Sequence, residues 1–146
     1  MTPGREGGWQ PLGQYAAVGD GRSAALVGAD GSIDWWRVPN PDSTPYFDRL
    51  LAGEDGRRLA VAPVGPFTVE RRYRLGSNVL EQVFATATGR ARVTYSLNSG
   101  PPGRLPWGEL AHRVEGLEGT VEVRSGRRLG QANPCARQAR TVTWCT

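Results

Sequence analysis

The fold is decided by residues 15–37, which read YAAVGDGRSAALVGADGSIDWWR. Three short apolar segments, 15–18, 23–27 and 32–37, are separated in this stretch by Gly19-Asp20-Gly21 and Ala29-Asp30-Gly31. Asp-Gly pairs favour tight hairpin turns because both central residues tolerate positive φ angles. Since helical periodicity is absent, the stretch predicts three antiparallel strands joined by two turns.

The same pattern of short strands and turns continues along the rest of the chain. Further strands are predicted at 58–62, 67–73, 79–86, 91–97, 110–115, 120–124 and 141–144, with hairpin turns at 75–78, 88–90 and 116–119. Several short strands at regular spacing are typical of sandwiches and barrels. We therefore predict an all-β, antiparallel, supersandwich-like β-sandwich in a single domain with one short helical turn.

Two segments interrupt this pattern. Residues 38–45 contain three prolines, which remove backbone donors and fix φ, and so predict an irregular loop. Asp42 or Ser43 could then cap a short helical turn over 46–51, which is the one helix that we predict. Residues 98–106 are rich in glycine and proline and predict a second loop.

The chain has 146 residues, which is room for one domain. We expect a flexible N-terminal segment at 1–12, the sandwich at 13–125 and a diverged C-terminal tail at 126–146 that holds at most one last strand. No apolar run is long enough to span a membrane, and the N-terminus lacks the apolar core of a secretory signal. A cytoplasmic location is the expectation.

Two cysteines, Cys135 and Cys145, are expected to be reduced thiols in that compartment. Together with the single histidine, His112, they cannot complete a four-ligand zinc site. We expect neither a metal nor a cofactor.

The 18 basic residues are all arginine, and the net charge is +4. A nucleic-acid-binding protein gathers such charge on one face. Strand alternation sends Arg71 and Arg72 to opposite faces. Arg124, Arg127 and Arg128, in a glycine-containing loop, are the group that could converge. Nucleic-acid binding is therefore only weakly supported by the sequence.

Acidic and aromatic residues gather in the first third of the chain. Asp30 and Asp42 suit turns, whereas Asp34 could be an exposed strand residue. Trp35 and Trp36 are adjacent, and successive strand side chains point to opposite faces. One indole can therefore fill the core while the other lies on the outer face, where it would contact a sugar or another protein surface, of which we favour the second.

Residues 15–35 closely resemble the opening of the bacterial glycoside hydrolase family 15 proteins, the glucoamylase and trehalase-like enzymes. The likeness continues at Pro39, Asp42-Ser43, Phe47, Leu50-Leu51, Arg71-Arg72-Tyr73, Leu80-Glu81, Phe84, Gly89 and residues 113–119, and so covers about 13 to 124. The loop keeps Pro39 and Asp42-Ser43 but lacks the Arg and Phe that the family usually carries between them. The resemblance does not extend beyond about residue 137.

The resemblance implies that this region is the family's N-terminal antiparallel β-sandwich domain. Hydrolysis in the family is the work of a later (α/α)6 barrel with one general-acid and one general-base glutamate. Twelve helices with their connections need on the order of 200 residues. We therefore expect that this chain alone does not hydrolyse maltooligosaccharides, starch or trehalose.

The function predicted is that of a stand-alone, non-catalytic domain that binds carbohydrate or protein. The expected partners are a catalytic domain or a second copy of the chain, and the expected ligand is an α-glucan or another small molecule. The binding surface is predicted at Trp35, Trp36, Arg37, Pro39, Asn40, Asp42, Ser43 and Phe47. The alternative is a small enzyme that uses the sandwich cleft, with Asp34, Asp42 and His112 as acid–base residues.

Overall fold

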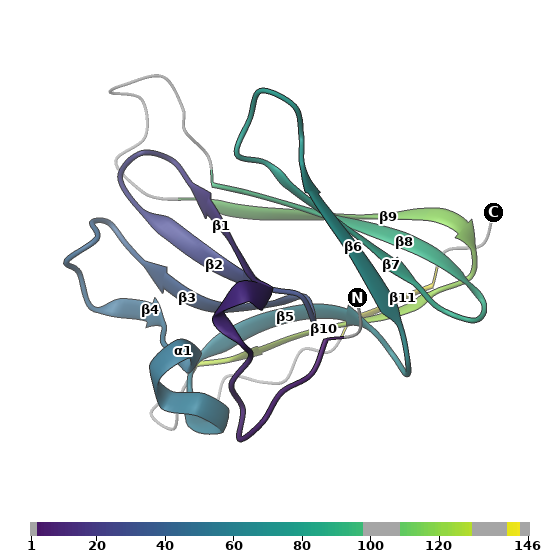
Figure 1. Ribbon diagram of the computed structural model, residues 1–146, viewed down its shortest axis with the longest axis horizontal. Helices are drawn as coiled ribbons and strands as arrows, with labels where there is room; N and C mark the ends of the chain where they lie inside the picture. Colours follow the sequence, from purple (N-terminus) through teal and green to yellow (C-terminus); the bar gives the residue numbers. More distant parts are fainter. Residues whose placement is uncertain (1–2, 98–108, 130–139, 144–146) are drawn as a thin grey trace.

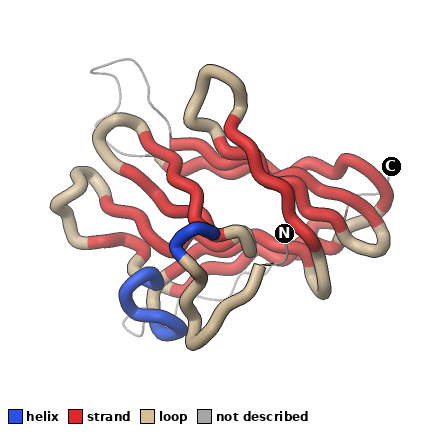
Figure 2. The backbone as a smooth tube through the Cα atoms, viewed as in Figure 1, coloured by secondary structure: helices blue, strands red, loops and turns tan. Residues whose placement is uncertain are grey.

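The computed structural model describes residues 3–97, 109–129 and 140–143 as two antiparallel sheets. The strands are β1 Tyr15–Gly19, β2 Ala24–Gly28, β3 Ser32–Arg37, β4 Pro45–Phe47, β5 Arg58–Pro63, β6 Thr68–Tyr73, β7 Leu80–Ala85, β8 Gly89–Leu97, β9 Leu110–Gly119, β10 Glu122–Arg128 and β11 Arg140–Thr143. Three short helical turns accompany them: η1 Leu12–Gln14, α1 Arg49–Ala52 and η2 Gly53–Asp55. The predicted all-β sandwich is confirmed (Figures 1 and 2).

The larger sheet has the strand order β1-β2-β3-β5-β10-β11, and β4 pairs with β3 outside this path. The smaller sheet is the meander β6-β7-β8-β9, in which each strand pairs with the next along the chain. The two sheets face each other and enclose one apolar core (Figure 1). Adjacent antiparallel strands need only short turns, which agrees with the spacing of turn residues in the sequence.

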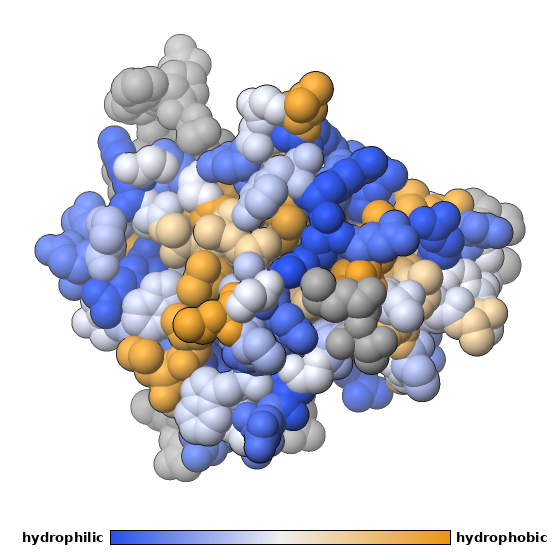
Figure 3. Space-filling view, viewed as in Figure 1, coloured by the Kyte–Doolittle hydropathy of each residue, from blue (hydrophilic) through white to orange (hydrophobic). Residues whose placement is uncertain are grey.

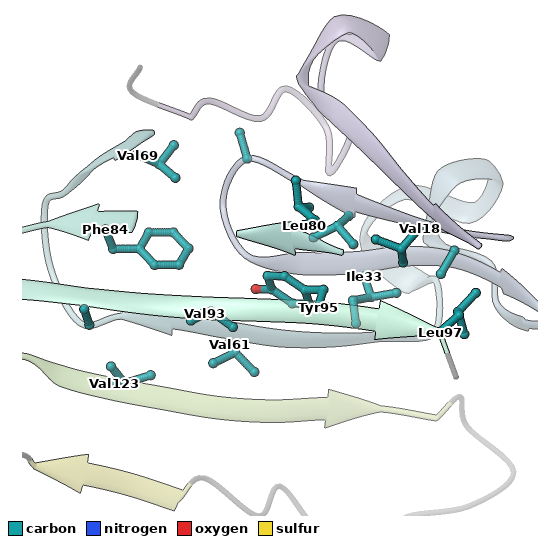
Figure 4. Packing of buried hydrophobic residues seen from close by; sticks show 14 of the residues in the cluster. Val18, Ile33, Val61, Val69, Leu80, Phe84, Val93, Tyr95, Leu97 and Val123 are labelled. Atoms are coloured by element: carbon teal, nitrogen blue, oxygen red, sulfur yellow. The ribbon is translucent and has the colours of Figure 1, made fainter. Parts of the chain in front are cut away.

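The core is made of alternate residues from both sheets (Figure 4). In β8, Ala91, Val93, Tyr95 and Leu97 are buried, as the alternation in the sequence predicts. They face Val18, Ile33, Val61 and Val123 of the larger sheet. Gln82 crosses this core and donates a hydrogen bond of 2.9 Å from its Nε2 to the Gly28 carbonyl, which links the two sheets by a polar contact.

The free edge of β1 is covered by side chains of the smaller sheet. The Tyr73 hydroxyl accepts a hydrogen bond from the Ala17 amide at 3.0 Å and donates one to the Ala17 carbonyl at 2.8 Å. Arg71 donates to the Gln14 carbonyl at 2.6 Å, and Asn78 donates to the Gly19 carbonyl. Edge strands expose unpaired backbone groups, so these side chains both protect the edge and join the sheets.

The predicted helical turn over 46–51 is wrong in its first half. Pro45–Phe47 form β4, and the helix begins at Arg49 after Asp48. Phe47 is buried, and Tyr46 and Phe47 pack their rings against Trp36, which favours pairing with β3 over a helix. Neither Asp42 nor Ser43 caps the helix, and the Asp48 carboxylate binds the Arg57 guanidinium instead.

Two other local predictions need correction. The predicted turn at 116–119 lies within β9, where the register with β8 shifts between Arg90 and Ala91 and leaves Leu117 as a bulge. The turn therefore comes later, before β10, and Arg124, Arg127 and Arg128 lie in this strand rather than in a loop. The predicted loop at 98–106, Cys135 and Cys145 lie outside the described residues.

Residues 3–12, which we predicted as part of a flexible segment, lie against the larger sheet and against α1. We call residues 3–11 the N-terminal arm. Glu6 and Trp9 form a backbone bridge within it, and the Trp9 indole donates a hydrogen bond of 3.1 Å to the Leu50 carbonyl. The arm thereby covers part of the outer face of the sheet, the face that points away from the core.

Candidate functional site

A β-bulge places Asp34 on the outer face of the larger sheet. Leu26 pairs with Trp35 and the next residue of β2, Val27, pairs with Ile33, so Asp34 is the extra residue of β3. Ile33 points into the core, whereas the Asp34 side chain reaches groups of the N-terminal arm and of β1. Bulges commonly re-aim a side chain in this way.

Asp34 belongs to a cluster of charged groups under the N-terminal arm. Arg5 is its centre: its Nε donates to Asp30 Oδ2 at 2.6 Å, and its Nη2 donates to Asp34 Oδ2 at 2.7 Å and to Asp30 Oδ1 at 3.1 Å. The Tyr15 hydroxyl also donates to Asp34 Oδ2, at 2.7 Å. Ser32 accepts a hydrogen bond from Arg5 and donates to Asp30 Oδ1 from both its amide and its hydroxyl.

The cluster balances its charges at low exposure. The side chain of Asp34 is fully buried, and that of Arg5 is 15% exposed. Arg49 of α1 supplies a second cation, with its Nη1 3.8 Å from Asp34 Oδ1. Two guanidinium groups therefore face two carboxylates. Because buried charges are tolerated only when paired, we define Arg5, Asp30, Asp34 and Arg49 as the charged cluster and interpret it as structural.

Burial and the ion pairs shift the pKa values of this cluster. Burial raises the pKa of Asp30, but hydrogen bonds from Arg5 and Ser32 outweigh it, and the net pKa is lowered. Burial lowers the pKa of Arg5, yet the contacts with Asp30 and Asp34 reverse the effect and raise it. Burial and the hydrogen bond to Asp34 raise the pKa of Tyr15 to about 12. Arg5 and Asp30 are therefore held in their charged forms.

We expect the lowered pKa of Asp30 to appear as acid sensitivity. The folded protein binds the Asp30 proton less readily than the unfolded chain, so this contribution to stability is complete above pH ~4, the usual pKa of an aspartate, and is lost as the pH falls below it. Urea unfolding between pH 7 and 2 should show a steeper loss of unfolding free energy for the wild type than for Asp30→Asn. Asp42→Asn controls for the loss of one exposed carboxylate. Equal slopes for the wild type and Asp30→Asn would contradict this assignment.

The two tryptophans point to opposite sides of the sheet, as the sequence predicts. Trp36 is opposite the buried Ala25, packs against the core and donates a hydrogen bond of 3.1 Å to the Ser23 hydroxyl. Trp35 is opposite Leu26 on the outer face, and the Arg37 guanidinium lies 4.9 Å from the centre of its ring. Both indoles are half-buried.

The loop between β3 and β4 continues from this outer indole. Arg37 donates a hydrogen bond of 2.9 Å to the Pro41 carbonyl, and Asn40 and Ser43 close a tight turn through two hydrogen bonds of 3.1 Å. Pro39, Asn40 and Asp42 are exposed, and Ser43 is half-buried. Of the predicted surface residues, Phe47 is the one that is buried in the core.

The structure does not bring Asp34, Asp42 and His112 together as an acid–base group. Asp34 is fully buried and bonded to Arg5, whereas Asp42 is exposed in the loop. His112 lies on β9, in the other sheet, and opposite Tyr95. Within the described ranges, moreover, no three His, Cys, Asp or Glu side chains form a group that could hold a metal ion.

The three arginines that the sequence suggested are joined by Arg58 in the lining of one cavity. Arg58 of β5 and Arg124, Arg127 and Arg128 of β10 line a cavity of about 740 Å³ on the larger sheet. Arg58 and Arg128 are cross-strand neighbours and both donate to the Glu54 carbonyl, while Arg128 also binds Asp55. Arg71 and Arg72 diverge as predicted, toward Gln14 and Glu81 respectively.

Sequence reasoning missed Arg5 and Gln10. Both lie in the segment that we predicted as flexible, and Gln10 is only 6% exposed. A buried aspartate requires a cation, but the sequence suggested that Asp34 is an exposed strand residue, so it gave no signal for Arg5. The N-terminal arm shows no strand or helix periodicity, so no local pattern indicated that Gln10 is buried.

The fold is an antiparallel β-sandwich module in which Asp30 and Asp34 are paired with arginines. The family model described as trehalase-like, N-terminal, matches residues 7–98. The chain belongs to this family of trehalase-like N-terminal domains.

Three curated relatives are trehalases. The chain is 32% identical over 116 residues to the trehalase of Mycolicibacterium smegmatis, which covers 77% of this chain and 17% of that protein. It is 36% identical over 84 residues to the trehalase of Mycobacterium tuberculosis, covering 54% of this chain and 12% of that protein. It is 26% identical over 120 residues to the trehalase of Thermoplasma volcanium, covering 80% of this chain and 19% of that protein.

The chain thus spans less than a fifth of the length of these relatives. The search of solved structures gave no significant match. None of the helices in the described part of the chain is long and apolar enough to cross a membrane.

Proposed function

We propose that this domain is non-catalytic and docks onto the catalytic part of a trehalase-type hydrolase of glycoside hydrolase family 15. Over four-fifths of each trehalase relative lies outside the region that matches this chain. The aspartates that could have served acid–base catalysis are buried with Arg5 or separated from each other. Binding is therefore the role that the accessible surface supports.

The observation that carries the proposal is an exposed apolar surface on the outer face of the larger sheet. Figure 3 shows apolar side chains gathered around η1, α1 and β2. Leu12 is 78% exposed and Leu51 is 69% exposed, and Leu26 and Trp35 are half-buried partners on the outer face of the sheet. We call these four residues the outer apolar surface.

An uncovered surface of this kind favours a protein partner. Contiguous exposed apolar side chains rimmed by polar groups mark protein interaction sites. Arg37 and the exposed loop residues Asn40 and Asp42 supply a polar rim next to Trp35. This combination of apolar centre and polar edge is typical of protein interfaces.

The test is binding to the Mycolicibacterium smegmatis trehalase from which the N-terminal domain has been deleted. Calorimetry should show a 1:1 complex with the wild-type chain. The double variant Leu12→Ala/Leu51→Ala should bind at least tenfold more weakly, a loss of about 1.4 kcal/mol. Both leucines are exposed, so the variant should fold with little change in stability.

Leu75→Ala is the matched control, because Leu75 is fully exposed at the β6–β7 turn of the other sheet. Its affinity should equal that of the wild type. Equal weakening by both variants would contradict docking through the outer apolar surface. Analytical ultracentrifugation tests the other expected partner, a second copy of the chain. If the wild-type chain is a dimer, the double variant is a monomer and neither binds the hydrolase, the outer apolar surface is a dimer interface instead.

A further inference from the structure

The cavity lined by arginines on β5 and β10, which we call the arginine cavity, lies on the outer face of the larger sheet. Val61 and Val123 of these strands point into the core. Arg58 and Arg124 alternate with them along the strands and therefore point outward. The register places Arg128 directly opposite Arg58, and so on the same face (Figure 1). Three guanidinium groups thus stand on one side of a strand pair.

Small residues form the floor of the arginine cavity. Ala60, Ala62 and Gly126 lie between the arginines on the two strands. A β-carbon at Gly126 would meet no atom within 4 Å, so the space above this residue is open. The cavity volume of about 740 Å³ is within the range of sites for small molecules, ~300–1,000 Å³. The cavity therefore has room for a ligand between its long side chains.

The positive charge of the arginine cavity is only partly offset by the protein. Of the described residues that line the cavity, none is acidic. Arg58 donates to the Glu54 carbonyl at 2.9 Å, but this acceptor carries no net charge. Arg128 pairs with Asp55, whose side chain is 89% exposed, and ion pairs in solvent are weak. Among the described residues, Arg124 forms no ion pair.

Like charges are crowded at the cavity. Burial and the neighbouring Arg49 and Arg128 together lower the pKa of Arg58. The nearest acidic residue along β10, Glu122, comes two positions before Arg124 and does not line the cavity. Residues 123–146 contain five arginines and no acidic residue. A bound anion would relieve this repulsion, because an opposite charge at short range favours the charged form of each arginine.

The spacing of the arginines favours a ligand with several anionic groups in a row. Arg124 and Arg128 are four residues apart on one strand, which corresponds to about 13 Å at ~3.3 Å per residue. A single small anion can contact one end of this row, whereas a chain of anionic groups can contact both. Guanidinium groups bind phosphoryl oxygens through paired hydrogen bonds. A short chain of phosphoryl groups therefore matches both the charge and the length of the cavity.

We propose that the arginine cavity binds a linear chain of phosphoryl groups, carried by a free oligophosphate or by a nucleoside triphosphate. Arg124 binds one end of the chain, and Arg58 and Arg128 bind the other. The site does not depend on docking to a hydrolase, since none of the four residues of the outer apolar surface lines this cavity.

The test is calorimetric titration of the chain with tripolyphosphate, ATP and inorganic phosphate, without divalent cations. Tripolyphosphate should bind 1:1 with Kd on the order of 10 μM, and inorganic phosphate at least tenfold more weakly. The affinity should fall as salt is added, because salt screens exposed charges. Tighter binding of ATP than of tripolyphosphate would assign the ligand to a nucleotide. Equal or weaker binding of ATP would assign it to a free oligophosphate.

Two variants change the cavity in different ways. Arg124→Gln removes one charge and should weaken tripolyphosphate binding at least fivefold. Gly126→Leu keeps every arginine but fills the open floor, and it should weaken binding at least tenfold. Arg22→Gln is the matched control, because Arg22 is exposed in the turn between β1 and β2 and does not line the cavity. It should bind as the wild type does, and so should Leu12→Ala/Leu51→Ala.

Three outcomes would overturn the proposal. The first is the absence of saturable binding of both tripolyphosphate and ATP. The second is equal affinity of Arg124→Gln and Arg22→Gln for the ligand, which would mean that the net charge of the chain and not the cavity attracts it. The third is tighter binding of a single-stranded oligonucleotide than of tripolyphosphate, weakened by Arg124→Gln, which would assign the cavity to nucleic acid. Thermal unfolding verifies that each variant is folded, and Arg124→Gln decides if Gly126→Leu is not.

Discussion

Replacing Arg5 with alanine is expected to lower the free energy of unfolding by about 3–5 kcal/mol, the range measured when one partner of a buried ion pair is removed. Arg5 makes direct contacts with both Asp30 and Asp34. Without it, the fully buried Asp34 keeps Tyr15 as a donor and Arg49 at 3.8 Å. The loss should be measurable by urea unfolding at pH 7.

Arg113→Ala is the matched control for this prediction. Arg113 is 76% exposed and pairs with Glu115 at 3.0 Å, and exposed ion pairs contribute about 0–1 kcal/mol. Hydrogen exchange adds a local measurement, because the amides of the N-terminal arm should exchange faster in Arg5→Ala than in the wild type. If the two alanine variants are equally stable, the charged cluster does not hold the arm.

The strand predictions are correct where the alternation of apolar residues in the sequence matches the alternation of buried residues in the structure. In β8 the apolar residues alternate, and the same residues are buried in the core. The turn residues between β1, β2 and β3 were also sufficient to place these strands. These features are local, since each depends on residues a few positions apart.

The errors arose where a distant contact overrides the local pattern. Residues 45–47 form a strand because Phe47 pairs with Trp36, about ten positions earlier in the chain. Asp34 was considered as an exposed strand residue, but the bulge and Arg5 bury it completely. The local sequence pattern does not predict the pairing of Phe47 with Trp36 or the contact of Asp34 with Arg5. The segment that holds Arg5 was predicted to be separate from the sandwich.

The outward position of Trp35 was predictable, whereas its surroundings were not. Alternation along a strand places one of two adjacent tryptophans on each face. The leucines that join Trp35 on the outer face come from η1, β2 and α1. Their approach depends on the tertiary fold, so the sequence indicated a contact residue but not a surface.

Gly31→Ala should cause the second large effect, a loss of about 3–5 kcal/mol or failure to fold. Gly31 has φ 82°, and a β-carbon there would lie 2.1 Å from the Val61 carbonyl oxygen. The Val61 amide donates to the Gly31 carbonyl at 2.9 Å, so the two backbones cannot separate without breaking the contact between β3 and β5. Left-handed strain of about 1–2 kcal/mol adds to the steric overlap.

Gly21→Ala separates these two causes within the same stretch of sequence. Gly21 has φ 86°, nearly the same conformation, but a β-carbon there would meet no atom within 4 Å. Its substitution should therefore cost only the strain, about 1–2 kcal/mol. Thermal and urea unfolding of both variants measure the difference. Equal losses at the two positions would mean that the close approach of Gly31 to Val61 does not limit the fold, and that backbone conformation alone selects glycine in this Asp-Gly turn.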